Sequence, residues 1–183
     1  YNLSKNYLYI PNQFWLHKNH DILINSAYEL KKRKYFIQFV LSGDNSLNKE
    51  HFKSLFKKIE NLGLNNYFNY LGMIPRADVS RLIYKSKAVI NPSLFEGWNT
   101  SVEEAKIFKK QIILSDISIH REQMSKNCFL FKKSSPKQLA KVIMNLKSKK
   151  NPNLSVIKSI YLRSRKKFAL KYSDILKKVN LMY

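Results

Sequence analysis

The sequence has little of several residue types on which common folds and sites depend. Its single cysteine, Cys128, excludes an intramolecular disulfide, and its apolar neighbours predict a packed thiol in a strand. The four glycines form neither a G-x-G-x-x-G fingerprint nor a P-loop, which argues against a dehydrogenase or a nucleoside triphosphatase. No run of about 18 apolar residues occurs, so no membrane-spanning segment is expected.

Acidic residues are also scarce, because 34 Lys and Arg face 12 Asp and Glu and give a formal charge of +22. Such a balance favours anionic partners. The lysines are scattered in short clusters, which indicates a diffuse basic surface, and peripheral contact with an anionic membrane is its best functional interpretation. A nucleic-acid partner is not expected, since no RNP-like or zinc-knuckle string is present. A non-catalytic basic α/β module that binds membranes or nucleic acid remains the alternative interpretation of the whole chain.

Apolar segments alternate between strand and helix character. We expect strands at residues 7–10, 35–41, 67–71, 88–91, 111–114 and 128–131, and helices at 20–33, 51–62, 77–86, 100–108 and 136–146. This alternation predicts an α/β fold with a mostly parallel six-stranded sheet and helices on both faces. Residues 1–150 would form one domain, and residues 151–183 a basic helical segment.

The rest of the chain is organised around residues 91–105. Pro92 ends a buried strand, so Glu96 falls in a loop at the carboxyl end of the sheet, where α/β proteins bind ligands. Thr100 and Glu103 fit an N-terminal capping box, and a helix that begins there suits a phosphate. Glu104 follows eight positions after Glu96, so one crevice can receive two carboxylates. Helix capping alone is the structural alternative for these residues.

The string of residues 92–105, followed by residues 111–116, resembles the Glu-x7-Glu signature of retaining glycosyltransferases of family 4. The resemblance extends over roughly residues 7–147. It implies half of a GT-B fold, in which two Rossmann-like domains face each other across a cleft, and places this chain in the C-terminal, donor-binding half. A missing N-terminal domain is then a further partner, on which the basic C-terminal segment could pack instead of on its own domain.

The loop at residues 12–20 resembles the family's first donor-domain loop, where an arginine and a lysine hold the donor diphosphate. Lys18 matches the lysine, whereas Gln13 occupies the arginine's place, so one positive charge of the clamp is missing. His17 and His20 have the spacing of a metal pair, but no third ligand is visible. We therefore interpret them as hydrogen-bonding or structural histidines.

Two other loops resemble family elements. Gly72, Met73 and Ile74 lie in a segment like the one whose backbone reads the donor base, and a glycine lets the chain approach a base closely. A plain strand-to-helix turn is the alternative. His120 and Arg121 follow the fifth strand and are weaker candidates for lining the cleft.

The resemblance implies roles for these residues. Glu104 would bind the ribose hydroxyls, and the catalytic candidates Glu96 and Lys18 would act at the sugar and the diphosphate. Hydrogen-bond donors would come from Asn99, Thr100 and Ser101. The resemblance further implies retaining transfer of a hexose from a nucleoside diphosphate sugar to a glycan or lipid-linked acceptor, with no metal or cofactor expected. We expect a cytoplasmic protein, peripheral at the inner membrane face, that is inactive as this isolated domain.

Overall fold

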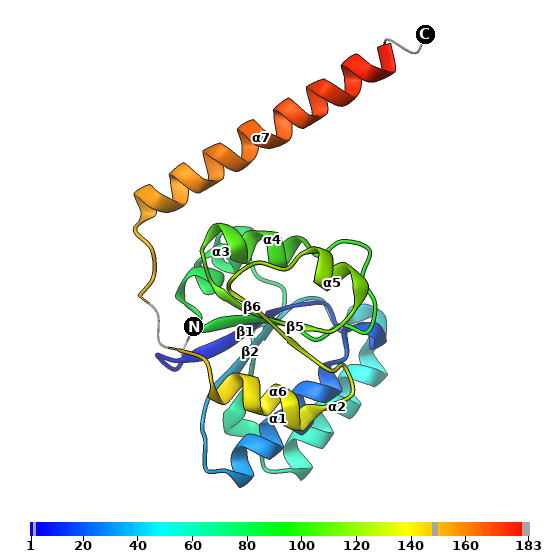
Figure 1. The fold of residues 1–183 in the computed structure, drawn as a ribbon. Helices are drawn as coiled ribbons and strands as arrows, with labels where there is room; N and C mark the ends of the chain where they lie inside the picture. The colour runs from blue at the N-terminus through cyan, green and yellow to red at the C-terminus, as the bar shows by residue number, and fades with distance from the viewer. Residues whose placement is uncertain (2, 148–149, 181–183) are drawn as a thin grey trace. The chain divides into compact units, whose positions relative to one another are not determined.

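The computed structural model describes residues 1, 3–147 and 150–180. Contacts between Cα atoms divide the chain into two units, Tyr1–Asn151 and a second unit that begins at Pro152. The first unit is an α/β domain built around one sheet (Figure 1). The second unit is a helical segment, described separately below.

The sheet has six described strands: β1 (Tyr7–Pro11), β2 (Gln38–Ser42), β3 (Phe68–Tyr70), β4 (Ala88–Asn91), β5 (Gln111–Ser115) and β6 (Cys128–Phe131). Their order is β3-β2-β1-β4-β5-β6, and every neighbouring pair is parallel. The predicted α/β fold is therefore confirmed, and the described sheet is parallel throughout rather than mostly so. Cys128 is buried at the start of β6, as predicted.

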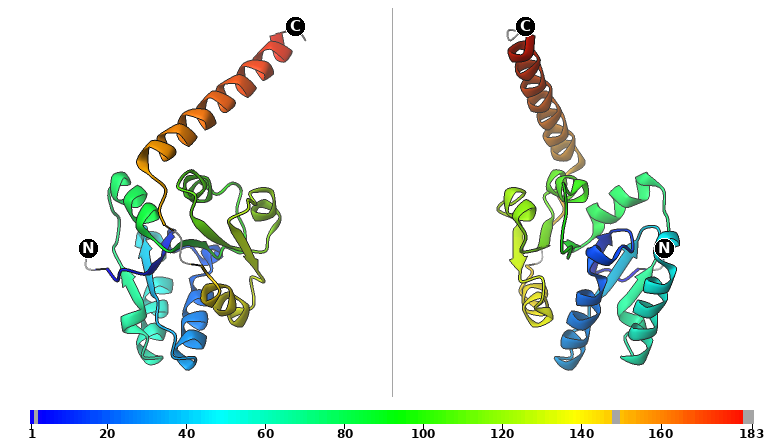
Figure 2. Two further views of the ribbon diagram at one scale, coloured as in Figure 1. Left: turned by 60° about the vertical axis from the view of Figure 1, so that its left-hand side comes forward. Right: turned by 90° about the vertical axis from the view of Figure 1, so that its right-hand side faces the viewer.

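Helices cover both faces of this sheet (Figure 1). One layer contains α1 (His20–Lys32), α2 (Lys49–Asn61) and α6 (Pro136–Met144), and the other α3 (Arg76–Lys85), α4 (Thr100–Ile107) and α5 (Ser118–Glu122). Figure 2 shows α1 and α2 side by side in both views. Strand β1 is buried on both sides, with Leu8 and Ile10 in one hydrophobic cluster and Tyr7 and Tyr9 in the other. This pattern is typical of an interior parallel strand.

The strand order creates a switch point between β1 and β4. From β1 the chain continues to β2 and β3 on one side, whereas from β4 it continues to β5 and β6 on the other. The loops that follow β1 and β4 therefore lead to helices on opposite faces and leave a crevice between them, which is where open α/β sheets bind ligands.

The expected elements differ from the observed ones in some details. Strand β2 begins three residues later than predicted, at Gln38, and the expected loop after β5 contains the short helix α5. Three short 3-10 helices, at Leu16–Lys18, Ser46–Asn48 and Asn65–Tyr67, had no periodic signal that could predict them.

The second unit contains one helix, α7 (Leu154–Asn180), where one or two basic helices were expected. Its exposed apolar residues include Leu154, Tyr161 and Leu162. Among the described residues, no helix has the length and hydropathy needed to cross a membrane.

Candidate functional site

Two adjoining pockets occupy the crevice between the loops after β1 and β4. The first has a volume of about 240 Å³ and is lined by Pro11, Asn12, Gln13, Trp15, Lys18, Glu96, Trp98, Asn99, Thr100 and Ser101. The second, of about 220 Å³, is lined by Pro11, Asn12, Gln13, Ser42, Gly43, Met73, Ile74, Arg76, Val79, Thr100, Ser101 and Glu104. Every candidate catalytic or donor-binding residue except Gly72 lines one or both pockets. The structure therefore brings residues from four distant segments to one place.

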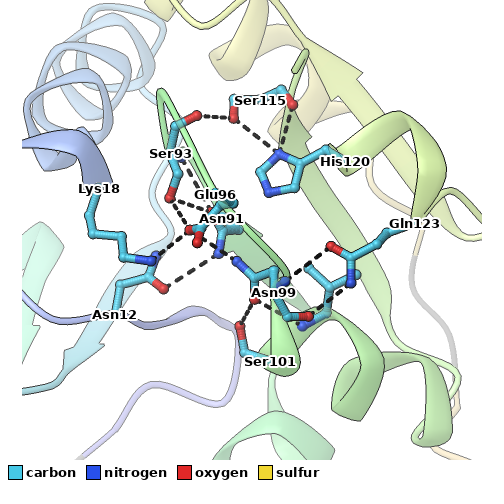
Figure 3. A network of polar contacts seen from close by, with 11 residues as sticks. Asn12, Lys18, Asn91, Ser93, Glu96, Asn99, Ser101, Ser115, His120 and Gln123 are labelled. Carbon is cyan, nitrogen blue, oxygen red and sulfur yellow. Dashed lines mark hydrogen bonds and ion pairs between the residues drawn. The ribbon is translucent and has the colours of Figure 1, made fainter. Parts of the chain in front are cut away.

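Glu96 and Lys18 form an ion pair in the first pocket (Figure 3). Lys18 Nζ lies 2.6 Å from Glu96 Oε1, and the two side chains are only 13% and 8% exposed. Glu96 Oε1 also accepts a hydrogen bond from Asn99 Nδ2, at 3.2 Å. The carboxylate and the ammonium are thus held in fixed positions while both remain at the pocket wall.

The two loops that carry this pair are tied together by main-chain and side-chain bonds. The backbone N–H of Leu94 donates to the His17 carbonyl at 2.7 Å. Asn19 adopts a left-handed conformation, with φ of 54°, and its side-chain amide donates to the carbonyl of Pro92 at 3.1 Å. Position 18 is consequently placed against the loop that contains Glu96.

A buried polar cluster beneath the ion pair was not foreseen from the sequence. Ser93 Oγ lies 2.6 Å from Glu96 Oε1 and 2.7 Å from Asn91 Oδ1, and its single hydrogen can serve one acceptor at a time. Asn91 is fully buried, and its Nδ2 lies 3.4 Å from Asn12 Oδ1. The available signal was an asparagine at or just after the end of each of two apolar strands, β1 and β4.

The N-terminus of α4 is capped by Asn99, so the predicted capping box of Thr100 and Glu103 is wrong. Asn99 Oδ1 accepts from the backbone N–H of Val102 at 3.3 Å and from the Ser101 hydroxyl at 2.7 Å. Glu103 instead accepts from Lys106 and from the buried side chain of Gln123. An asparagine oxygen reaches the first free N–H groups as well as a threonine does, and its amide hydrogens can additionally hold Glu96.

The loop after β5 supports the same region from behind (Figure 3). His120 is fully buried, and its Nδ1 donates to the Ser115 carbonyl at 2.8 Å, which fixes the hydrogen on that nitrogen. The hydroxyl of Ser115 donates to the Ser93 carbonyl. Burial lowers the pKa of His120. Neither candidate from this loop lines the pockets, since Arg121 is exposed and paired with Asp116.

Glu104 lies in the second pocket, where its Oε1 is paired with the guanidinium of Arg76. The ion pair with Glu104 raises the pKa of Arg76. The other carboxylate oxygen, Oε2, is buried and has no hydrogen-bond partner among the described residues. Glu104 Oε2 thus has unused hydrogen-bonding capacity, and a ligand reaches it only when the side chain of Glu104 or Arg76 moves. Arg76 was not singled out from the sequence.

The opposite wall of the second pocket comes from the ends of β2 and β3. Gly43 has φ of 146°, and a Cβ at this position would overlap the carbonyl group of Asn12. Gly72 has φ of 70° and accepts at its carbonyl from the Gly43 N–H at 3.0 Å. Gly72 does not line the pocket, whereas Met73 and Ile74 do.

The two histidines of the first loop do not form a metal pair. His20 is 3% exposed and stacks on Phe14 at 4.4 Å between ring centroids, and neither of its ring nitrogens has a hydrogen-bond partner in the described part of the chain. His17 instead contacts the ring of Trp15. His20 is therefore packed as a buried ring, and the described residues contain no group of three His, Cys, Asp or Glu that could hold a metal.

An α/β sheet with this strand order and a helix N-terminus at its switch point is typical of α/β domains that bind nucleotides. Comparison with known proteins narrows the class. Residues 2–163 match the model of the family described as glycosyl transferases group 1, and the chain belongs to that family.

Solved structures with the same fold are GT-B glycosyltransferases, and the chain is one Rossmann-like half of that fold. A glycosyltransferase from Rickettsia africae matches with a TM-score of 0.70 and 22% identity, over 79% of this chain and 37% of that one. Anabaena Alr3699/HepE in complex with UDP-glucose matches with a TM-score of 0.67 and 24% identity, over 76% of this chain and 38% of that one.

The C-terminal domain of LpcC, a glycosyl transferase group 1 family protein from Francisella tularensis, matches with a TM-score of 0.66 and 21% identity. The match covers 75% of this chain and 73% of that one. The chain thus spans less than two fifths of the first two structures. No curated protein matches it.

Proposed function

We propose that this chain is the donor-binding half of a retaining glycosyltransferase of family 4, which transfers a hexose from a nucleoside diphosphate sugar to a glycan or lipid-linked acceptor. The observation that carries the proposal is the position of Glu96 and Glu104, which line adjoining pockets that share Gln13 and the first two residues of α4. The solved Anabaena relative, which was crystallised with UDP-glucose, supports a nucleotide-sugar donor.

Glu104 would bind the ribose, because its two carboxylate oxygens can each accept a hydroxyl hydrogen from a vicinal diol. Arg76 would shift on binding and uncover Oε2, which is buried and unpartnered among the described residues. The diphosphate would lie at the N-terminus of α4. There the backbone N–H groups of Thr100 and Ser101 have no partner within the helix and the helix dipole favours an anion. Gln13 contributes an uncharged donor on the opposite wall, so this site holds less positive charge than one with arginine there.

Lys18 and Glu96 would act at the bond that breaks. Negative charge develops on the diphosphate as it leaves, and the Lys18 ammonium together with the α4 N-terminus would stabilise it without a metal or a cofactor. Glu96 would accept a hydroxyl of the transferred hexose and hold the ring so that the acceptor attacks with retention at the anomeric carbon. The ion pair between the two residues fixes their separation before the donor arrives.

Acceptor recognition would come largely from the N-terminal domain of the whole enzyme, so we propose that this chain alone binds donor weakly and turns over little. The formal charge of +22 supports peripheral contact with the anionic inner face of the cytoplasmic membrane, where a lipid-linked acceptor would be available.

The test is calorimetric titration of UDP, GDP and ADP into the full chain and into Glu104→Gln. We expect one nucleotide to bind best and its affinity to fall about tenfold in the variant, because a ribose hydroxyl loses its charged acceptor. Glu103→Gln is the matched control, since Glu103 immediately precedes Glu104 but lines neither pocket. Equal affinities of Glu104→Gln and the parent for all three nucleotides would contradict the proposal.

A further inference from the structure

The sequence contains two tryptophans, and both line the first pocket. Trp15 lies in the loop after β1 and Trp98 in the loop after β4, so the indoles reach the same pocket from opposite sides of the switch point. Trp15 is 38% exposed and Trp98 is 55% exposed. Exposed indoles leave a large apolar area in water, and such a cost at both tryptophans of a chain points to a ligand surface rather than to the core.

The rest of this pocket is polar. Its other lining groups include the ammonium of Lys18, the carboxylate of Glu96 and the amide of Asn99, which are joined through Glu96 Oε1. Lys18 Nζ also lies 5.9 Å from the centroid of the Trp15 ring, a cation–π contact between two residues that line the pocket. The site thus offers flat apolar faces beside grouped hydrogen-bonding groups.

A hexopyranose has the matching chemistry, because its ring presents an apolar face of C–H groups and an edge of hydroxyls. We propose that Trp15 and Trp98 hold a hexopyranose ring in the first pocket, with the indoles against the C–H face and Glu96 and Asn99 at the hydroxyls. This inference rests on the proposed function, since the neighbouring second pocket would then take the nucleoside. The hexose held is that of the donor, and a free hexopyranoside shares its chemistry.

The two indoles also provide the readout. Because no other tryptophan is present in the sequence, emission excited at a wavelength that tyrosine does not absorb reports on this pocket alone. The full chain is titrated with three matched pairs of ligands, namely UDP and UDP-glucose, GDP and GDP-mannose, and ADP and ADP-glucose. We expect the sugar nucleotide of the preferred base to shift and quench the emission, and its parent nucleotide to change the emission much less.

The variants Trp15→Ala and Trp98→Ala separate the role of each indole, with affinities measured by calorimetry. Each is expected to bind the sugar nucleotide about tenfold more weakly while its affinity for the bare nucleotide stays within about twofold. Trp98→Phe keeps an aromatic face and is expected to recover part of the loss. Matched controls are Leu16→Ala and Phe95→Ala, because these neighbours are 67% and 69% exposed but do not line the pocket.

Sugar-nucleotide affinities that stay unchanged in both alanine variants would overturn the inference. Equal losses for the bare nucleotide and the sugar nucleotide would overturn it as well, because the indoles would then serve the nucleotide or the fold.

A parent chain that binds none of the six ligands would overturn the proposed function instead. A methyl hexopyranoside titration would then decide the tryptophan assignment separately. Quenching that is lost in the alanine variants would support it, and unchanged emission would reject it.

Discussion

Lys18 Nζ and Glu96 Oε1 lie 2.6 Å apart although 78 positions separate the two residues in the chain. Both side chains are largely withdrawn from solvent, at 13% and 8% exposure, so neither charge is well hydrated once its partner is removed. This pair links the two loops of the switch point as well as presenting both charges to the first pocket.

Removal of one partner is expected to destabilise the fold more than removal of both. Lys18→Met leaves Glu96 charged and poorly hydrated and should lower the free energy of unfolding by about 1 to 3 kcal/mol. The double variant Lys18→Met/Glu96→Gln should recover part of that loss. Urea unfolding of the four proteins in a double-mutant cycle measures the coupling, and additive effects of the two substitutions would show that the pair contributes nothing.

Asn99 has two separable roles, as cap of α4 and as donor to Glu96. Asn99→Ala should lower the free energy of unfolding by about 1 kcal/mol and also weaken donor binding, whereas Asn99→Asp keeps a capping oxygen and loses the donor to Glu96. Chemical unfolding and calorimetry separate the two effects.

Ser135→Ala is the control for the loss of a cap. Ser135 caps α6 by accepting from the N–H of Gln138, and it lies outside both pockets. It should cost similar stability with unchanged nucleotide affinity. A donor-binding defect in this control, or equal binding by Asn99→Asp and the parent, would refute the assignment to Asn99.

Two glycines with positive φ should respond differently to alanine. Both substitutions incur the strain of a positive φ, of about 1 to 3 kcal/mol, but only Gly43→Ala also forces a Cβ into the Asn12 carbonyl. A Cβ added at Gly72 would meet no atom within 4 Å. Thermal unfolding should therefore show a clearly larger loss of stability for Gly43→Ala than for Gly72→Ala. Equal losses would mean that the loop after β1 moves away from the added Cβ with little loss of stability.

Acid should destabilise the domain partly through His20. Burial, followed by the nearby His51 and Lys18, lowers the pKa of His20 from 6.5 to about 3, so the unfolded chain binds the proton more tightly between these values. The free energy of unfolding should consequently fall as the pH drops below 6.5, by about 1.4 kcal/mol per pH unit from this group.

His20→Phe isolates that contribution, because it keeps a ring against Phe14 and removes a group whose nitrogens have no partner in the described part of the chain. Urea unfolding should show that the free energy of unfolding of the variant increases relative to that of the parent as the pH falls below 6.5. Above pH 6.5 the difference between the two proteins should stay constant. A constant difference throughout would contradict the prediction.

Much of the fold follows from local patterns. Apolar runs bounded by Pro92 or by short polar segments mark the strands, and amphipathic spacing marks the longer helices, because both depend on which face each residue buries. The loop that contains Glu96 could be assigned to the ligand edge for the same reason, since a parallel strand always delivers its following loop to that edge.

Contacts between distant loops could not be predicted in this way. The pairing of Arg76 with Glu104, and the bond from Ser115 to the Ser93 carbonyl, depend on which strands become neighbours, and one sequence does not contain the order β3-β2-β1-β4-β5-β6. The prediction of the α4 cap was wrong for a more local reason. Asn99 and Thr100 are both good capping residues, and the hydrogen bond that Asn99 makes to Glu96 favours the earlier start.

The two pockets meet at a common wall of Pro11, Asn12, Gln13, Thr100 and Ser101, but their far ends come from separate segments. Under the proposed function, selectivity for the base and selectivity for the sugar can therefore diverge independently. Changes at Met73 and Ile74 should alter one without disturbing the other, and changes at Trp98 the reverse. A substitution in the common wall would affect both selectivities at once. Relatives should therefore differ in specificity through changes at the far end of one pocket while the common wall stays the same.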